Sequence, residues 1–425
     1  MSDTPATFAS LGLSPALQRA ARELGFEAPT PVQTAAIPAA LAGQDVLASA
    51  ETGSGKTAAF AFPILQQVEA RNARAAAGAP RAPQVLVLVP TRELAAQSGA
   101  LLRAAARCLA VSVKVSLLYG GVSINPQLMA LRGGADIVVA TPGRLLDVIE
   151  HNGLTLDHVR CLVLDEADRL LDAGFAEELQ RVLGLLPAQR QHLLFSATFP
   201  ASVQALSDTL LRDPVRVTIA QALTLDTELG DRKLTERAIT VDAARRTPLL
   251  RHLIEQEGWT RVLVFVATRY ACNHVADKLC RAGLAAAAFH GDASQGARSR
   301  VLEDFKSGAL RVLVATDLGG RGIDIAQLPV VLNYDLPRAA ADYVHRIGRT
   351  ARAGAEGLAV SFVSAATEGH FRLIEKRQAR RVPREQIAGF EPTDVAPEGA
   401  ATGGVKGRRP SKKDKLRAAA ARTGS

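Results

Sequence analysis

The segment from Ala50 to Thr57 places two glycines just before a lysine and a threonine, in the order Ala-Glu-Thr-Gly-Ser-Gly-Lys-Thr. It follows an expected strand and precedes an expected helix. Glycines there let backbone N–H groups curl around a phosphate chain, and the helix N-terminus adds positive potential. Lys56 would neutralise the β- and γ-phosphates, and Thr57 would hold Mg²⁺. The other candidate phosphate-binding residues are Ala50, Glu51, Thr52, Gly53, Ser54 and Gly55. The alternative is a glycine-rich turn with a solvated lysine.

Carboxylates follow a second apolar run. Val159 to Leu164 is an expected strand, and it leads into Asp165-Glu166-Ala167-Asp168. The carboxyl ends of parallel strands are where an α/β sheet places its ligand. We therefore expect Asp165 to hold Mg²⁺ through its hydration shell, and Glu166 to orient and deprotonate an attacking water. Alone, the tetrapeptide could start a solvated acidic helix, but the phosphate loop argues against that.

Apolar runs alternating with amphipathic stretches indicate the elements that position these residues. A chain of 425 residues with 48% hydrophobic content favours two cores, since one core stops growing near roughly 250–300 residues. Parallel strands with crossover helices produce such alternation, so we predict an α/β protein with two tandem domains. The expected strands are Asp45–Ala50, Gln84–Pro90, Val113–Tyr119, Asp136–Ala140, Val159–Asp165, His192–Ala197 and Val215–Ile219, then Arg261–Thr268, Ala285–His290, Arg311–Thr316, Val330–Tyr334 and Gly357–Val363.

Charge divides the chain into a balanced body and a basic tail. The net charge is +9, and residues 404–425, with eight basic residues and one acidic, account for +7 of it. After Phe390 the composition shifts to Pro, Gly, Ala, Lys and Arg, which predicts a disordered tail. Such a tail would attract a polyanion without reading its sequence.

The N-terminus and the cysteines favour the cytoplasm. The start at Met1 shows no basic patch followed by an apolar run, and no apolar stretch reaches the roughly 18–20 residues of a membrane span. The four cysteines form no CxxC pair and have no histidine at zinc spacing. We expect a soluble, cytoplasmic protein whose cysteines are small buried side chains.

The motifs and their order resemble the DEAD-box family of ATP-dependent RNA helicases (superfamily 2), over about residues 8 to 365. The resemblance implies two tandem RecA-like domains with parallel sheets and a disordered basic tail. The expected parts are a Q-motif region (1–36), an ATP-binding domain (37–219), a linker (220–231), a C-terminal helicase domain (232–390) and the tail (391–425). The short basic tail is similar to that of bacterial RhlE-type members, which suggests RNA turnover, cold adaptation or ribosome assembly.

By this resemblance, residues outside the phosphate loop also contact ATP. The segment Gly25 to Gln33 is similar to the family's Q motif. Gln33 is expected to hydrogen-bond the adenine edge and Phe8 to stack on its face, with Phe26 in the same pocket. Asp324 is expected to contact the ribose. Without the family, Phe8 would be an ordinary core residue.

The run from Tyr343 to Arg352 resembles the family's motif VI. Arg349 and Arg352 are three residues apart and therefore share a helix face, and the resemblance implies that both are arginine fingers supplied by the second domain. Arg346 is expected to brace the DEAD carboxylates. It belongs to a group that couples the ATP state to strand separation, together with Asp168, Ser196 and Thr198.

The remaining motifs follow expected strands and are implied to hold RNA phosphates, where hydroxyls and arginines grip a backbone without reading bases. The expected RNA contacts are Thr91, Arg92, Gly121, Thr141, Arg144, Gln295, Arg298, Thr316 and Asp317. Gly319 and Gly320 stand where the family more often has alanine, which predicts a looser loop. Ala351 stands where glycine is commoner.

Together the motifs imply an RNA-stimulated ATPase and helicase that uses ATP and Mg²⁺, clamps RNA and locally unwinds short duplexes. The expected partner is RNA, as a single strand or short duplex, bound without sequence preference and without a membrane. We expect a monomer that works with degradosome or pre-ribosome proteins. An ATP-gated RNA clamp and a DNA translocase are the alternatives. The translocase is disfavoured because the chain lacks room for accessory DNA-binding domains.

Overall fold

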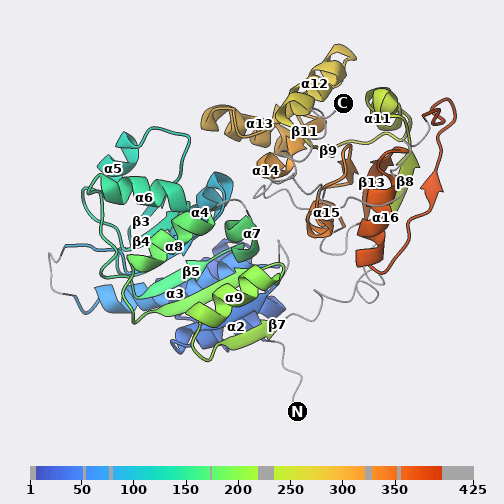
Figure 1. Cartoon of the computed structure of the whole chain (residues 1–425). Helices are drawn as coiled ribbons and strands as arrows, with labels where there is room; N and C mark the ends of the chain where they lie inside the picture. Colours follow the sequence, from blue (N-terminus) through green and yellow to red (C-terminus); the bar gives the residue numbers. More distant parts are fainter. Residues whose placement is uncertain are drawn as a thin grey trace, which may run out of the picture.

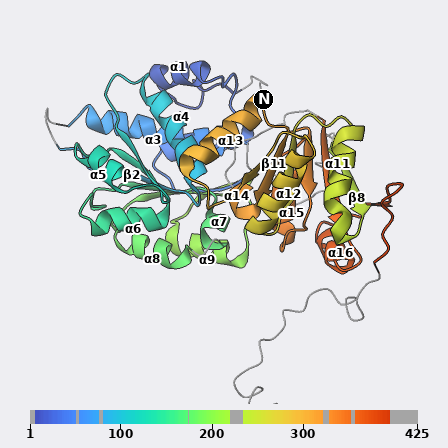
Figure 2. The same ribbon diagram turned by 90° about the horizontal axis from the view of Figure 1, so that it is seen from above.

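The computed structural model describes residues 6–50, 54–75, 80–172, 175–218, 234–320, 328–351 and 356–394. These residues form two lobes, each built around one parallel sheet (Figure 1, Figure 2). The first lobe is blue to green and the second is yellow to red in both views. The predicted α/β class and the pair of parallel sheets are confirmed.

The first sheet has the strand order β3-β4-β2-β5-β6-β1-β7, and every pairing is parallel. Its strands are β1 (Val46–Ser49), β2 (Val85–Leu88), β3 (Val115–Leu118), β4 (Ile137–Ala140), β5 (Cys161–Leu164), β6 (Gln191–Ser196) and β7 (Val215–Thr218). Its helices are α1 (Pro15–Glu23), α2 (Pro31–Leu41), α3 (Lys56–Asn72), α4 (Arg92–Ala106), α5 (Asn125–Leu131), α6 (Pro142–Glu150), α7 (Ala167–Asp172), α8 (Ala176–Gly184) and α9 (Ala201–Leu210).

The second sheet repeats the plan, with the order β10-β11-β9-β12-β13-β8-β14. Its strands are β8 (Leu234–Thr240), β9 (Val262–Val266), β10 (Ala286–Phe289), β11 (Val312–Thr316), β12 (Val330–Asn333), β13 (Gly357–Val363) and β14 (Arg384–Glu385). Its helices are η1 (Ala243–Arg245), α11 (Arg246–Gln256), α12 (Arg269–Arg281), α13 (Gln295–Ser307), α14 (Asp317–Gly320), α15 (Ala340–Ile347) and α16 (Glu368–Arg377).

Continuous apolar runs form these central strands because both faces of each sheet are covered. In β2, Val85 and Val87 pack into the core beneath α1 to α4, whereas Leu86 and Leu88 pack into the core beneath α6, α8 and α9. Since neighbouring side chains of a strand point to opposite faces, one run serves two cores. Because the strands of each sheet are parallel, their carboxyl ends all lie at one edge of the sheet. The motif residues follow the strands at that edge.

Strands β8 and β14 belong to the second sheet but are not among the strands expected from the sequence. Near the start of the expected tail, Thr393 donates from its backbone N–H to the Asp242 carboxylate at 2.8 Å. The expected linker, 220–231, and residues 395–425 of the tail lie outside the described residues.

No helix in the described part of the chain is long and apolar enough to cross a membrane. The four cysteines are free thiols. Cys161 and Cys272 are buried as expected, whereas Cys280 is exposed.

Candidate active site

The phosphate-loop motif lies between β1 and α3. Gly55 caps α3 with a φ of 94°, and a Cβ there would lie 2.4 Å from Nε2 of Gln33, so both the backbone and the space require glycine. Lys56 is 5% exposed, and its Nζ donates to the carbonyl of Ala50 at 2.8 Å. The lysine is thus folded over its own loop. Glu51, Thr52 and Gly53 lie outside the described residues.

Three carboxylates, Asp165, Glu166 and Asp168, follow β5 and form what we call the acidic edge. Asp165 and Glu166 are 2% and 3% exposed. Burial raises the pKa of Asp165 to about 6, although the nearby Lys56 ammonium opposes the shift. Glu166 has a φ of 51°, which is uncommon for a residue other than glycine. Its Oε2 lies 3.3 Å from Nε of Arg169 but has no hydrogen-bond partner. Strained backbone and unpaired buried acceptors often accompany function.

Few protein groups are available for a divalent cation. Across the residues that the structure describes, no group of three or more His, Cys, Asp or Glu side chains could hold a metal ion. Mg²⁺ is often bound by one or two carboxylates together with substrate phosphates and water. The buried Asp165 carboxylate and the Thr57 hydroxyl fit that mode. We therefore expect the ion to arrive with the nucleotide.

Asp168 joins the acidic edge to the end of β6. The Thr198 hydroxyl donates to Oδ2 of Asp168 at 2.7 Å, and the backbone N–H of Asp168 donates to Oγ of Ser196 at 3.2 Å. Nε2 of His345, from the second lobe, lies 3.8 Å from the same Oδ2. The Asp168 carboxylate therefore lies next to both the residues that follow β6 and a residue of the other lobe.

Motif VI lines a cavity between the lobes, together with Arg169 of the first lobe. Arg349 is 5% exposed and lies on the wall of this cavity. Arg352 lies outside the described residues.

Arg346, which is expected to brace the DEAD carboxylates, contacts a carboxylate of its own lobe. Its guanidinium donates to both carboxylate oxygens of Asp317, at 2.6 and 2.8 Å, and to Oδ1 of Asn333 at 3.0 Å, all within its own lobe. Such a bidentate pair with a nearby carboxylate satisfies two N–H groups of the guanidinium at once. His345 is the residue that approaches the DEAD segment instead.

The Q-motif glutamine connects α2 to the phosphate loop. Gln33 is fully buried, accepts a hydrogen bond from the backbone N–H of Thr30 at 2.9 Å and donates to the carbonyl of Gly55 at 3.2 Å. A primary amide has two donors and two acceptor lone pairs. One donor and one acceptor position of Gln33 therefore remain for a ligand.

Phe8, which is expected to stack on adenine, packs against the core of the first lobe. Phe8 is 7% exposed and meets Phe62 edge to face, with centroids 5.8 Å apart. Phe26 also packs against Phe62, at 5.7 Å, but is only partly buried. Of the two rings, Phe26 has more surface to offer a ligand. Asp324 lies outside the described residues.

In the first lobe, the expected RNA contacts gather around one glycine turn. Gly121 has a φ of 76°, and a Cβ there would lie 2.0 Å from Nη1 of Arg92. Arg144 donates from Nη2 to the carbonyl of Val122 at 2.9 Å. Thr91 and Thr141 are the N-caps of α4 and α6. Two guanidinium groups and two helix starts thus meet at the carboxyl edge of the sheet.

In the second lobe, two of the expected RNA contacts, Arg298 and Asp317, form ion pairs with other side chains of the protein. Nη2 of Arg298 lies 2.7 Å from Oε1 of Glu93 across the lobe boundary, and the two side chains are 5% and 6% exposed. Asp317 is held by Arg346. Oε1 of Gln295 is buried without a hydrogen-bond partner, and the Thr316 hydroxyl accepts from the backbone N–H of Gly319 at 3.2 Å.

Gly319, which is expected to loosen its loop, lies against the backbone at the end of β10. A Cβ at Gly319 would lie 2.4 Å from the carbonyl oxygen of Phe289. Glycine therefore permits a close backbone contact between α14 and the end of β10.

Sequence reasoning missed Glu93, Arg169 and His345. Arg169 stands three residues after Glu166, a spacing that places both on one helix face, and this signal was available. Glu93 and His345 face residues of the opposite lobe, so no spacing in the chain could show their partners.

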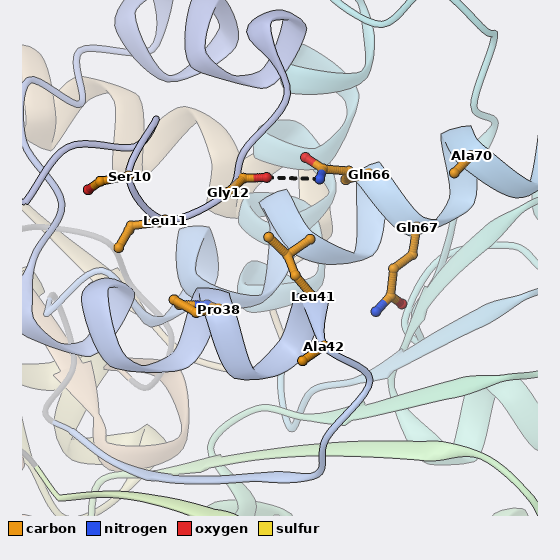
Figure 3. A pocket seen from close by; sticks show the side chains of 9 residues that line it. All are labelled: Ser10, Leu11, Gly12, Pro38, Leu41, Ala42, Gln66, Gln67 and Ala70. Atoms are coloured by element: carbon orange, nitrogen blue, oxygen red, sulfur yellow. Dashed lines mark hydrogen bonds between the residues drawn. The ribbon is translucent and has the colours of Figure 1, made fainter.

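A further pocket of about 580 Å³ lies at the other ends of α2 and α3. Figure 3 shows Gln66 donating to the carbonyl of Gly12, at 3.0 Å, beside Leu41 and Pro38. Gln33 and Lys56 lie near the opposite ends of these helices. The pocket is therefore separate from the phosphate loop.

Comparison with known proteins agrees with this geometry. The family "DEAD/DEAH box helicase" matches residues 30–206, and "Helicase conserved C-terminal domain" matches residues 245–354. The ATP-dependent RNA helicase DeaD of Mycobacterium tuberculosis is 42% identical over 386 residues, covering 91% of this chain and 66% of that protein. The DEAD-box ATP-dependent RNA helicase CshA of Geobacillus kaustophilus is 39% identical over 380 residues, covering 89% of this chain and 78% of that protein.

Among solved structures, S. cerevisiae Dbp5 bound to RNA and ADP BeF3 superposes with a TM-score of 0.76 and 28% identity, covering 90% of this chain and 95% of that one. The residues matched by the two family models include the phosphate loop, Asp165 to Asp168 and α15. Because nearly the whole described chain aligns with its members, the chain belongs to the DEAD-box helicase family.

Proposed function

We propose that this chain is an RNA-stimulated ATPase that couples closure of its lobes on ATP to clamping of RNA and local unwinding of short duplexes. One observation carries the proposal. Arg349 of the second lobe lines the same cavity as Arg169, which lies 3.3 Å from the base candidate Glu166 of the first lobe. Since the reacting groups come from both lobes, turnover requires both lobes together.

The chemistry follows from the side chains. Lys56 would move from the carbonyl of Ala50 onto the β- and γ-phosphates. Thr57 and Asp165 would hold Mg²⁺, which would supply neutralisation of phosphate charge. Glu166 orients the attacking water and accepts its proton. Arg349 stabilises the charge on the transferred phosphoryl group, with Arg352 as the second expected finger. The remaining donor and acceptor positions of Gln33 match adenine N7 and N6.

RNA binding at the carboxyl edge of both sheets would favour the closed arrangement. Hydroxyls, guanidinium groups and helix starts hold phosphates, and contact with 2′-hydroxyls would select RNA over DNA. By linkage, ATP then strengthens RNA binding and RNA stimulates hydrolysis. If closure bends the held strand, a few base pairs at ~1.4 kcal/mol per step are lost. Local rather than processive unwinding is the expected result.

The decisive test compares Arg349→Ala with Arg377→Ala, an exposed arginine of α16 in the same lobe. Arg349→Ala should lower RNA-stimulated turnover by ~10³- to 10⁵-fold, with little change in ATP affinity, and Arg377→Ala should behave as the wild type. A large loss of ATP affinity with unchanged turnover would contradict the finger role. Strand displacement, measured in the same reactions, should follow turnover.

We further propose a cytoplasmic monomer that acts in RNA turnover or ribosome assembly, with partners among degradosome or pre-ribosome proteins. The basic tail and the bacterial DeaD and CshA relatives support this. RNAs crosslinked in cells to the Glu166→Gln variant, which should hold RNA in a closed state, would identify the process. An absence of ribosomal and messenger RNA among them would contradict it.

A further inference from the structure

An exposed aromatic pair stands at the start of α12. Tyr270, the second residue of this helix, is 77% exposed. Its ring stacks on that of His274, with centroids 5.6 Å apart and planes 13° from parallel. Side chains four residues apart lie on the same helix face, so the imidazole backs one face of the phenol ring. The high exposure of Tyr270 leaves much of its ring to solvent.

The pair lies at the sheet edge to which we assign RNA binding. β9 passes into α12 through Thr268, the N-cap of the helix. Nη1 of Arg269 lies 2.6 Å from Oδ1 of Asp292, in the loop before α13, which begins at Gln295. β11, which ends at Thr316, lies between β9 and β10 in the sheet. α12, α13 and α14 are neighbours, and α13 lies toward the first lobe (Figure 1, Figure 2).

The surroundings of Tyr270 favour a nucleobase as its ligand. Groups that hold the sugar-phosphate backbone leave the bases of a single strand free to stack on an aromatic ring. The other large exposed apolar side chains of the described residues, Met129, Leu185 and Leu373, are aliphatic and 43–55% exposed. Tyr270 alone among these four combines a planar ring, a stacked partner and an adjacent guanidinium at the RNA edge.

We propose that Tyr270, backed by His274, is a stacking platform for one nucleobase of the RNA strand held by the second lobe. The inference rests on the proposed function, because the strand must first be held at this edge by its phosphates. Every base presents a π-face, so the platform accepts any base. It therefore adds grip and fixes the register of the strand on the second lobe without selecting a sequence.

A base-specific probe tests the platform. Short RNAs that carry one 2-aminopurine at successive positions are bound to the full chain with a non-hydrolysable ATP analogue. In the wild type, one position should show quenched fluorescence. Tyr270→Ala should remove that quenching, and Tyr270→Trp should keep it. Tyr270→Ala should also weaken binding of intact RNA by roughly five- to tenfold, the lower end for base stacking, but not binding of RNA that is abasic at that position.

Leu373→Ala is the matched control, since it removes an exposed apolar side chain from α16 of the same lobe. It should leave quenching and affinity unchanged. If Tyr270→Ala quenches and binds as the wild type does, the platform is overturned while RNA-stimulated turnover of the wild type still supports the proposed function. If the wild type itself shows no RNA-stimulated turnover, the proposed function fails and the platform with it.

Discussion

At the scale of single residues, Asp165 shows how a nucleotide site strains the nucleotide-free protein. Burial raises its pKa from an ordinary 3.8 to about 6, and Lys56 only partly opposes this. The folded state therefore binds the Asp165 proton more tightly than the unfolded state does. As the pH rises from 3.8 to about 6, the free energy of unfolding falls. The ionised carboxylate is thus unfavourable until a cation arrives.

Asp165→Asn should therefore stabilise the nucleotide-free protein at about pH 7, by roughly 1–3 kcal/mol, because an amide carries no charge to desolvate. The gain should shrink near pH 4, where the Asp165 carboxyl of the folded wild type is largely protonated and carries no charge to desolvate. Urea unfolding of both proteins at the two pH values measures the difference. A wild type that is the more stable at about pH 7 would contradict the argument. Mg²⁺ with an ATP analogue should stabilise only the wild type strongly.

The sequence identifies the residues that follow strands but not the partners that folding brings to buried arginines. Lys56 and Asp165 could be found because the carboxyl ends of parallel strands meet at one edge. The partners of Arg346 and Arg298 could not be found, since these carboxylates are 29 and 205 positions away in the chain, at Asp317 and Glu93. Tertiary packing alone decides which carboxylate a buried guanidinium meets.

At the scale of elements, the start of β13 lies close to Thr350 and Ala351, the two residues that follow Arg349. Ala351 has a φ of 53°, a conformation that L-residues adopt at a cost of roughly 1–2 kcal/mol. This accounts for the glycine preference at that position. A Cβ at Gly357 would lie 2.2 Å from Oγ1 of Thr350 and 2.3 Å from the backbone nitrogen of Ala351. The start of β13 therefore presses on the residues just after Arg349.

Gly357→Ala should push Thr350 and Ala351 away and destabilise the second lobe by about 1–3 kcal/mol. Because the displaced residues adjoin Arg349, RNA-stimulated turnover should fall more than ATP affinity does. Gly184→Ala is the control, since nothing lies within 4 Å of a Cβ at that helix end. Thermal unfolding and steady-state turnover of both variants measure the effect. Equal behaviour of the two variants would show that the close contact is unimportant.

The elements themselves were predictable where apolar runs mark strands buried on both faces. β8 was not predicted because Leu234–Thr240 contains no continuous apolar run. Its residues are mainly polar or only partly buried, and Ala238 and Ile239 are the fully buried ones. β14 has only two residues. An edge region with one covered face lacks the apolar run that identifies a central strand.

At the scale of the whole molecule, the positive charge of residues 404–425 should contribute nonspecific electrostatic binding of RNA. Their deletion removes eight basic residues, and each lost phosphate contact lowers the salt slope of single-strand binding by ~0.7. We expect weaker RNA binding and a flatter dependence of log affinity on log salt, with basal ATPase retained. Binding isotherms over a range of salt concentrations measure the slope. An unchanged slope would remove the tail from RNA binding.

The pair of Glu93 and Arg298 should hold the lobes together, because it is buried and its members belong to different lobes. Removing one partner of a buried pair costs about 3–5 kcal/mol, since the other charge stays desolvated. Here that penalty falls on the closed arrangement alone. Glu93→Gln should therefore lower RNA affinity in the presence of an ATP analogue by ~10²-fold or more, with little change in the thermal unfolding of either lobe.

Reversing the pair, with Glu93→Arg and Arg298→Glu together, should restore part of the ATP-dependent RNA affinity that each single change removes. The coupling between the two changes measures the contact itself. The ion pair of Arg181 and Glu150, exposed on the first lobe at 59% and 60%, provides the control, and its reversal should change nothing. RNA binding with and without the ATP analogue reports both. If the reversed pair binds RNA with the ATP analogue no better than the worse single variant does, other contacts close the lobes. Opposite charges that face each other across the boundary would then not favour closure.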